Sequence, residues 1–378
     1  MRDAVIVDAV RTPVGKRNGS LAEIHPADLS AHVLKALVER TGIDPGVVDD
    51  VVWGCVGQVG DQANNIGRSG VLAAGWPTSV PATTVDRQCG SSQQALHFAA
   101  AGVIAGQYDV AVAGGVESMS RVPMGSSRYT GRPFGQTVLD RFGVEVFNQG
   151  VGAEMIAEKW AFSRRELDEF AARSHEKAAA ATDSGALVAQ IATVPGVLEA
   201  DEGIRRGTTV ETLAGLKTSF KVGGVIHAGN ASQISDGAAA LLITTPEKAK
   251  QLGLTPIAKY TAGAVSGADP IMMLTGPIPA TEKLLRRTGL SIDDIGAYEV
   301  NEAFAPVPMA WAVELKADHE RLNPLGGAIA LGHPLGGSGA ILMTRLIHHM
   351  RDNNIRYGVQ TMCEGGGTAN ATLVELAA

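Results

Sequence analysis

The sequence predicts an α/β protein built from two or three packed units, and three observations carry that prediction. At 378 residues and 39.1 kDa, the chain is too long for one ordinary small core. Its composition is 45% hydrophobic, with 46 glycines and only 4% aromatic residues, which is typical of a globular chain with many tight turns. Short β-branched runs also alternate with amphipathic stretches, the rhythm of strand and helix units.

The first part of the chain repeats this rhythm several times. We expect strands at residues 4–10, 50–56, 82–85 and 110–113, helices at 27–41 and 91–106, and an apolar segment at 70–75. The helix at 27–41 carries Leu29, Val33 and Leu37 on one face and stops at Gly42.

The character of the chain changes between Ser118 and about Asn230. This segment holds a polar loop at residues 126–133 and charged helices such as 163–181, and the apolar pattern resumes with strands at 236–245 and 297–300 and a helix at 306–316. We therefore predict a loop domain at 118–229 inserted into an N-terminal half, which covers 1–117 and resumes at about 230–255. A C-terminal half covers 256–378.

The two ends of the chain share a layout. A polar turn with Cys89 leads into a helix of small residues and a strand that ends in glycines. Near the C-terminus, a turn with His333 leads into a helix at 338–350 and a strand at 357–362, followed by Cys363 and three glycines. A duplicated α/β unit is the economical interpretation.

Charge and cysteine content exclude several classes of function. A net charge of -7 and a pI of about 5.7 provide no overall basic field for nucleic acid. The N-terminus lacks a signal-peptide pattern, and the apolar run at 95–105 is too short to span a membrane. Cys55, Cys89 and Cys363 fit neither a disulfide framework nor a metal site. We expect a cytoplasmic protein without bound metal, nucleic acid or membrane insertion.

Cys89 follows an expected strand and precedes an expected helix, so its sulfur should lie at a helix N-terminus. There the helix dipole and unpaired amides should lower the pKa of the thiol, which makes Cys89 a candidate nucleophile. The alternative is that Cys89 is a small buried residue with no catalytic role, which is the more common situation for a cysteine.

Three further residues have the chemistry of such a site. His333 sits in a glycine-rich turn stiffened by Pro334 and could deprotonate a thiol, or could be a capped structural residue. Cys363 precedes three glycines whose amides could bind an oxyanion, or form a plain turn. Asn301 could hold a water or cap the following helix. A dinucleotide-binding or phosphate-loop motif is absent from the sequence.

The order and amino-acid sequences of these segments resemble those of the thiolase family along nearly the whole chain. The matching segments are residues 86–91, 114–120, 229–232, 301–304, 326–334 and 363–367. The resemblance implies a duplicated five-layered α/β/α/β/α fold with an inserted loop domain, coenzyme A as co-substrate without a permanently bound cofactor, and a homodimer or homotetramer.

The resemblance also implies roles for single residues. Cys89 corresponds to the acylated nucleophile, His333 to the group that activates it, Cys363 to the general acid and base, and Asn301 to the residue that orients a water. The amides of Cys89 and Gly365 correspond to an oxyanion hole.

The implied substrate contacts are Ser232 near the pantetheine, Met273 and Phe304 at the acyl pocket, and Arg205 near the adenine and phosphates. Gln149 stands near the acyl end, where many thiolases have methionine. Together with Gln88, Ser92 and Glu364, it makes the chain look closer to degradative bacterial thiolases, among which are enzymes that shorten bulky acyl or sterol side chains.

The expected reaction is cleavage of a 3-ketoacyl-CoA into acetyl-CoA and a shortened acyl-CoA, or the reverse condensation. The alternatives are an acetoacetyl-CoA-specific biosynthetic thiolase, a decarboxylating ketosynthase and a non-catalytic lipid or sterol carrier on the same fold. A ketosynthase normally uses two histidines, whereas this chain has Asn301 and a second cysteine, and a carrier would have lost Cys89, His333 or Cys363.

Overall fold

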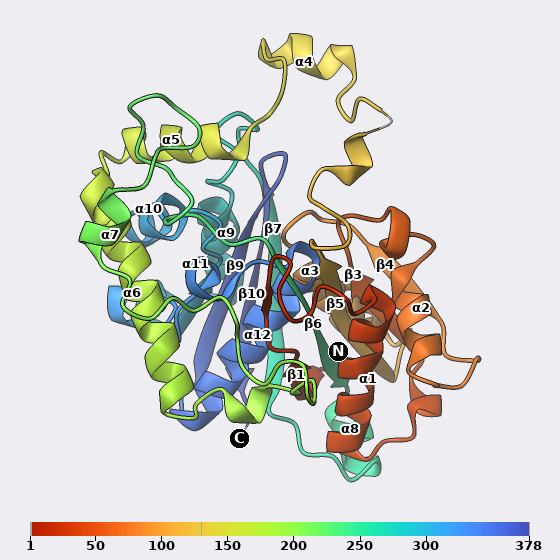
Figure 1. Cartoon of the computed structure of the whole chain (residues 1–378). Helices are drawn as coiled ribbons and strands as arrows, with labels where there is room; N and C mark the ends of the chain where they lie inside the picture. The colour runs from red at the N-terminus through yellow and green to blue at the C-terminus, as the bar shows by residue number, and fades with distance from the viewer. Residues whose placement is uncertain (1, 130, 378) are drawn as a thin grey trace.

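The computed structural model describes residues 2–129 and 131–377. Its strands form one mixed sheet in the order β4-β3-β5-β6-β1-β7-β10-β9-β8, with β2 paired to β6 (Figure 1). The strands are β1 (Ala4–Arg11), β2 (Gly15–Lys16), β3 (Asp50–Gly54), β4 (Ala82–Val85), β5 (Val110–Ser118), β6 (Ser235–Thr244), β7 (Ala258–Gly267), β8 (Ala297–Val300), β9 (Tyr357–Glu364) and β10 (Thr368–Leu376).

The α-helices lie between and around these strands. They are α1 (Pro26–Thr41), α2 (Ile66–Ala73), α3 (Ser91–Ala105), α4 (Gln136–Phe142), α5 (Gln149–Lys159), α6 (Arg164–Asp183), α7 (Val210–Ala214), α8 (Pro246–Gln251), α9 (Pro277–Thr288), α10 (Pro306–Leu315), α11 (Ala328–Leu331) and α12 (Leu335–Asp352). No helix in the described ranges combines the length and apolar character needed to cross a membrane.

The two halves of the sheet repeat one topology. In the first half β3 runs parallel to β5, and β5, β6 and β1 follow in antiparallel order. In the second half β8 runs parallel to β9, and β9, β10 and β7 follow in antiparallel order. Helix α3 precedes β5 and helix α12 precedes β9. The predicted duplication is confirmed, and β1 joins the halves by pairing with β7 as well as β6.

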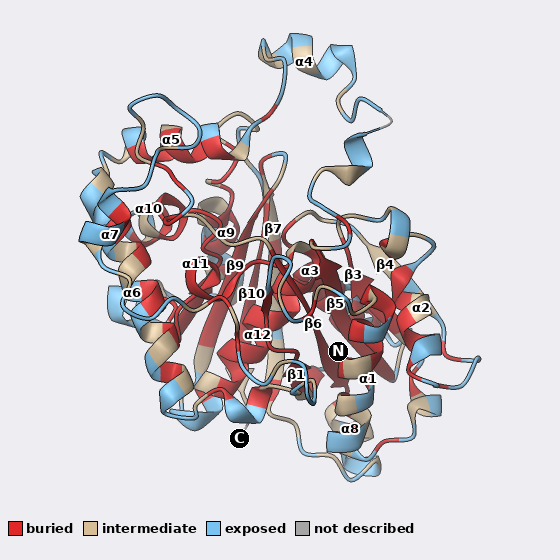
Figure 2. Ribbon diagram, in the orientation of Figure 1, coloured by how far each residue is buried: buried red, intermediate tan, exposed pale blue. Residues whose placement is uncertain are grey.

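The sheet and helices pack in five layers. Helices α3 and α12 form the central layer, since both contact strands of both halves. One apolar cluster joins them to Ala113 and Leu241 of the first half and to Val374 of the second. Helices α1 and α2 cover the outer face of the first half, and α9 and α10 cover that of the second. Figure 2 shows the central strands and α12 as buried.

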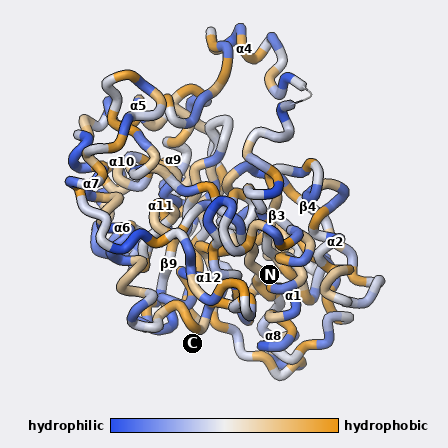
Figure 3. The backbone as a smooth tube through the Cα atoms, in the orientation of Figure 1, coloured by the Kyte–Doolittle hydropathy of each residue, from blue (hydrophilic) through white to orange (hydrophobic). Residues whose placement is uncertain are grey.

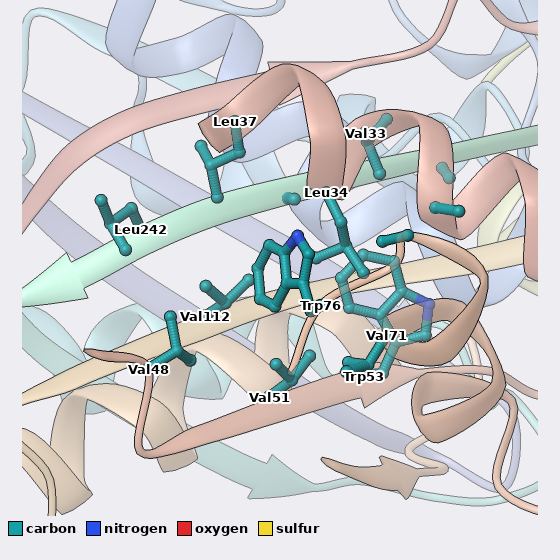
Figure 4. Close-up of a cluster of buried hydrophobic side chains, with 14 of the residues drawn as sticks. Val33, Leu34, Leu37, Val48, Val51, Trp53, Val71, Trp76, Val112 and Leu242 are labelled. Atoms are coloured by element: carbon teal, nitrogen blue, oxygen red, sulfur yellow. The ribbon is translucent and has the colours of Figure 1, made fainter. Parts of the chain in front are cut away.

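The outer layer of the first half illustrates why its sequence folds this way. Leu29, Val33 and Leu37 of α1 are all buried, as their spacing predicts, and the helix ends at Gly42, whose φ of 70° suits glycine. Figure 4 shows α1 side chains facing the strands, with the rings of Trp53 and Trp76 in the same cluster.

Several predicted boundaries agree with the structure and others shift. The strand at 82–85 and the strand at 297–300 are confirmed, and the helix at 91–106 is confirmed to within one residue. Residues 70–73 of the apolar segment at 70–75 form the end of helix α2, and β5 runs five residues beyond the predicted 110–113. Its extension is buried throughout and pairs with β6 up to Ser118, so tertiary pairing lengthens the strand.

The segment between β5 and β6 contains helices α4 to α7. Figure 1 shows α4 projecting away from the body, and Figure 3 shows hydrophobic residues along it between hydrophilic ones. This arrangement is compatible with an inserted loop domain, and the boundaries 1–117, 118–229 and 256–378 stay predictions.

Candidate active site

Cys89 and His333 occupy equivalent places in the two halves, because each lies in the turn that leads into a central helix, α3 or α12. Both side chains are buried and both line a cavity of about 720 Å³. Two unusual backbone conformations shape these turns. Gln88 has a φ of 48°, and Gly332 has a φ of 111°, where a Cβ would lie 1.9 Å from Ser235 Oγ. The duplicated topology therefore brings the two predicted residues together.

The hydrogen bonds around His333 settle which ring nitrogen carries the proton. Ser338 Oγ donates to the carbonyl of Pro334 at 2.8 Å, so it accepts from His333 Nδ1 at 2.6 Å. Asn301 Nδ2 lies 3.3 Å from His333 Nε2, as a donor to an unprotonated nitrogen would. Burial lowers the pKa of His333 to about 4. The ring is neutral near pH 7, and its unprotonated Nε2 accepts from Asn301 Nδ2.

Asn301 follows β8 and is buried. Its amide nitrogen faces His333, whereas Oδ1 has no hydrogen-bond partner among the described residues. A buried oxygen without a protein partner is suited to bind water or a substrate group. The predicted alternative, that Asn301 only caps a helix, is wrong, because α10 begins five residues later at Pro306.

The predicted lowering of the Cys89 pKa is wrong for this structure. Burial, with a smaller contribution from the charge of the nearby Glu364 carboxyl, raises the pKa of the thiol to about 12. The amides of Cys89 and Gly365 lower it, but by less than burial raises it. The sequence indicated the helix N-terminus, which lowers the pKa of Cys89, but not the desolvation of the thiol. Desolvation raises the pKa and is the larger effect here.

Cys363 is the penultimate residue of β9 and is buried. Burial raises its pKa well above the ordinary value, and the next largest cause is the charge on Cys89, which places the two thiols within electrostatic reach. Cys363 packs in an apolar cluster with Met273 and Phe304. Gly365 begins the turn from β9 to β10, beside Gln88 Oε1 and Gln149 Nε2, which would lie 2.9 and 3.4 Å from a Cβ at that position.

The predicted substrate residues divide into two groups. Ser232, Arg205, Phe304 and Gln149 line the cavity together with Cys89 and His333. Met273 does not line it in the described structure and lies buried behind it, in the cluster that contains Phe304.

Arg205 and Arg206 have different surroundings. Arg206 is paired with Asp183 at 2.6 Å, whereas Arg205 makes no ion pair within the described ranges. An exposed guanidinium at the cavity without a carboxylate partner is available to an anionic ligand.

Sequence reasoning missed other residues that line the cavity. Lys16 and Arg17 add positive charge on the side of Arg205, although Lys16 also contacts Glu202 at 3.6 Å. In the sequence, the signal that could have revealed these residues was the pair of adjacent basic residues, Lys16 and Arg17, soon after the first strand. Phe220 packs edge-on against Phe304 with ring centroids 5.8 Å apart, and nothing in its polar loop distinguishes it in the sequence. Within the described residues, no group of three His, Cys, Asp or Glu could hold a metal ion.

Comparison with known proteins gives consistent matches over the whole chain. The family model for the thiolase N-terminal domain matches residues 4–247, and that for the C-terminal domain matches residues 254–376. The chain is 50% identical to a steroid 3-ketoacyl-CoA thiolase of Mycobacterium tuberculosis, over 99% of this chain and 94% of that protein. It is 45% identical to a 3-ketoacyl-CoA thiolase of Erwinia tasmaniensis, over 99% of this chain and 100% of that one.

A solved structure agrees with these sequence matches. The crystal structure of the acetyl-CoA acetyltransferase of Bacillus anthracis superposes with a TM-score of 0.92 at 38% identity, covering 100% of this chain and 99% of that chain. Two family models that together span nearly the whole chain, and relatives matched over almost their full length, show that this protein belongs to the thiolase family.

Proposed function

We propose that this thiolase acts in the degradative direction, cleaving a 3-ketoacyl-CoA with free coenzyme A into acetyl-CoA and a shortened acyl-CoA. The chemistry is supported by one observation, that Cys89 and a neutral His333 with an unprotonated Nε2 line the same cavity. The degradative direction is supported by the similarity to proteins named 3-ketoacyl-CoA thiolase. As an acyltransferase of this family, the enzyme uses coenzyme A as co-substrate.

In the first half-reaction, Cys89 is the nucleophile. Because burial keeps its thiol protonated, the proton passes to His333 Nε2 as the sulfur attacks the 3-keto carbon. The bond between C2 and C3 then breaks, leaving the acyl group on Cys89 and the enolate of acetyl-CoA. Cys363 donates its proton to C2 and becomes a thiolate, while His333 and a water held by Asn301 stabilise the enolate oxygen.

In the second half-reaction, coenzyme A releases the acyl group. The Cys363 thiolate takes the proton of the coenzyme A thiol, whose sulfur attacks the acyl-cysteine. The amides of Cys89 and Gly365 stabilise the tetrahedral oxyanion, a role supported by their orientation toward the Cys89 sulfur. When the thioester to Cys89 breaks, the cysteine sulfur recovers its proton from His333.

For coenzyme A, we propose that Ser232 contacts the pantetheine and that Arg205 binds the phosphates. The exposed position of Arg205 at the cavity and the neighbouring Lys16 and Arg17 support this assignment. At the acyl end we place Phe304 and Gln149, with Met273 behind them.

The acyl chain is expected to be longer or bulkier than acetoacetyl. This expectation draws on the two 3-ketoacyl-CoA thiolases that match over nearly their full length, one of them named for steroid substrates. The acetoacetyl-specific alternative draws on the structural match to an acetyl-CoA acetyltransferase. The test is thiolysis of a series from acetoacetyl-CoA to long and branched 3-ketoacyl-CoA. Preference for acetoacetyl-CoA would favour the alternative, and no activity on any substrate would favour a carrier.

The two cysteines should be separable by substitution. We expect Cys89→Ala to abolish both cleavage and condensation, because the variant lacks the sulfur that we assign to hold the acyl chain. Cys363→Ala should still acylate Cys89 slowly from an acyl-CoA but should not break or form the carbon–carbon bond. Intact-mass measurement after incubation with acyl-CoA distinguishes the two variants, and Cys55→Ala is the matched buried control. Full turnover by Cys89→Ala would contradict the mechanism.

We further propose a cytoplasmic homodimer or homotetramer. The assembly is supported by exposed apolar side chains on the projecting segment around α4, among them Met124, Tyr129, Val138 and Val146. The compartment is supported by three unpaired cysteines, which suit a reducing environment. Light scattering of the purified protein measures the assembly directly.

A further inference from the structure

Glu364 is a buried acid beside the active site that the proposed mechanism does not use. It is 0% exposed, and among the described residues neither carboxyl oxygen has a hydrogen-bond partner of good geometry, although the Thr368 hydroxyl lies near enough to lower the pKa of the carboxyl. Burying a carboxyl group without partners costs free energy, so its presence beside Cys89 calls for a physical reason.

The direction of the Glu364 side chain places it against the start of α3. Because neighbouring residues of a strand point to opposite faces, Cys363 packs toward Phe304 and Glu364 points the other way. A Cβ on Gly90 would lie 2.1 Å from Glu364 Oε1 and 2.8 Å from Asn370 Nδ2. Asn370 Nδ2 donates to the Gly90 carbonyl at 3.0 Å. Glu364 and Asn370 therefore hold the residue directly after Cys89, and only glycine fits there.

The charged and polar groups around Glu364 come from three elements. The pKa of the carboxyl is raised to about 7 overall, and burial is the largest influence. Asp86, in the loop before α3, raises it as well, whereas Arg87 in the same loop and the Thr368 hydroxyl of β10 lower it. Cys363 precedes it on β9, and the charge of Glu364 raises the pKa of both Cys363 and Cys89. Glu364 thus changes charge near neutral pH within electrostatic reach of the proposed nucleophile.

We propose that Glu364 is a positioning residue that controls the reactivity of Cys89: its carboxylate, packed against Gly90, disfavours the thiolate, and its protonation removes that penalty. The inference rests on the proposed role of Cys89 as nucleophile. The thiol then stays protected until a bound substrate allows transfer of its proton to His333. As pH rises through about 7, Glu364 becomes charged, so the reactivity of free Cys89 should climb less steeply than that of an isolated thiol.

The test is the alkylation rate of Cys89 by iodoacetamide on the full chain, followed at the Cys89 peptide by mass spectrometry from pH 6 to pH 9. In the unsubstituted protein, the logarithm of the rate should bend near pH 7. In Glu364→Gln it should rise about tenfold per pH unit throughout, and at pH 8.5 the variant should react about tenfold faster, which corresponds to one pKa unit.

Glu299→Gln is the matched control. Glu299 is equally buried and without hydrogen-bond partners, and its pKa is also raised to about 7, but its charged neighbours are Arg345, Glu302, Lys177 and Arg11. This variant should keep the bend. Glu364→Ile, which cannot titrate, provides a second test if Glu364→Gln fails to fold.

The outcomes distinguish this inference from the function beneath it. A bend that persists in Glu364→Gln or Glu364→Ile, at unchanged rates, would overturn the role of Glu364 and leave thiolysis by Cys89 intact. A merely structural role would change thermal unfolding but not the pH profile. Full thiolysis by Cys89→Ala would overturn the proposed function and the inference with it.

Discussion

At the scale of single residues, Ser338 determines the tautomer of His333. Its hydroxyl hydrogen is committed to the Pro334 carbonyl, so His333 must donate from Nδ1 and present Nε2 to the cavity. A base with this orientation presents the ring nitrogen that can take a proton to the cavity that Cys89 also lines. The low pKa of His333 complements it, because the ring remains unprotonated at neutral pH.

Removal of this hydroxyl should impair activity more than folding. We expect Ser338→Ala to lower kcat/KM for thiolysis about 10-fold to 100-fold, by analogy with the loss seen when the partner that orients a metal-ligating histidine is removed. Ser126→Ala is the control, since Ser126 Oγ also donates to a proline carbonyl, at 2.6 Å from Pro123, but in an exposed loop. Equal kcat/KM in both variants would show that Ser338 does not orient the base.

At the scale of elements, Glu117 ties three parts of the chain to one carboxylate. It lies near the end of β5 and accepts hydrogen bonds from the amides of Val56 and Gly57 at 2.9 Å, from Gln62 Nε2 at 2.7 Å, and from the amide of Gly336 at 2.8 Å. The last of these bonds anchors the first turn of α12, three residues after His333.

The removal of this carboxylate should weaken both stability and activity. Glu117→Ala leaves several buried donors unpaired, each at a cost of about 1–3 kcal/mol, so we expect the free energy of unfolding to fall by about 3 kcal/mol or more. Thiolysis should fall as well, because the turn that carries His333 loses an anchor. Urea unfolding measures the first effect, with Glu39→Ala on the exposed face of α1 as the control. Coincident unfolding curves would refute the anchoring role.

At the scale of the whole molecule, the central helices join the two halves through polar contacts inside an apolar layer. His97 on α3 lies 2.7 Å from Thr372 Oγ1 on β10, and Gln93 Nε2 donates to the same hydroxyl. Burial lowers the pKa of His97 to about 4, so the histidine is neutral in the folded protein. The connection between the halves therefore depends on pH.

The sign of that dependence follows from the two pKa values of His97. The folded value of about 4 lies below the unfolded value of about 6.5, so its stabilising contribution is complete above pH 6.5 and is lost as pH falls toward 4. As pH falls from about 6 to about 4.5, the unsubstituted protein should lose stability that His97→Gln keeps. The difference between their free energies of unfolding should therefore grow in favour of His97→Gln by about 1.4 kcal/mol per pH unit. Urea midpoints across this window test the prediction, and a constant difference would contradict it.

Much of the fold could be predicted because its elements carry strong periodic patterns. The buried face of α1 and the strands β4 and β8 can be predicted from the local sequence alone. The length of β5 cannot, because four of its last five residues, Gly114, Gly115, Glu117 and Ser118, have weak strand propensity and the segment is held by pairing with β6. Strand propensity depends on what the strand packs against, and that information is distributed over the chain.

The sequence by itself determined the family and the duplicated layout. It also indicated the four residues that we propose at the centre of the chemistry, since Cys89, His333, Cys363 and Asn301 each lie in a short segment with a local signature. Only the tertiary structure decided the state of these groups. The pKa of Cys89 is raised because residues distant in the chain bury it and bring Glu364 close. Desolvation and charge act through space, so they become visible only when the two halves pack around α3 and α12.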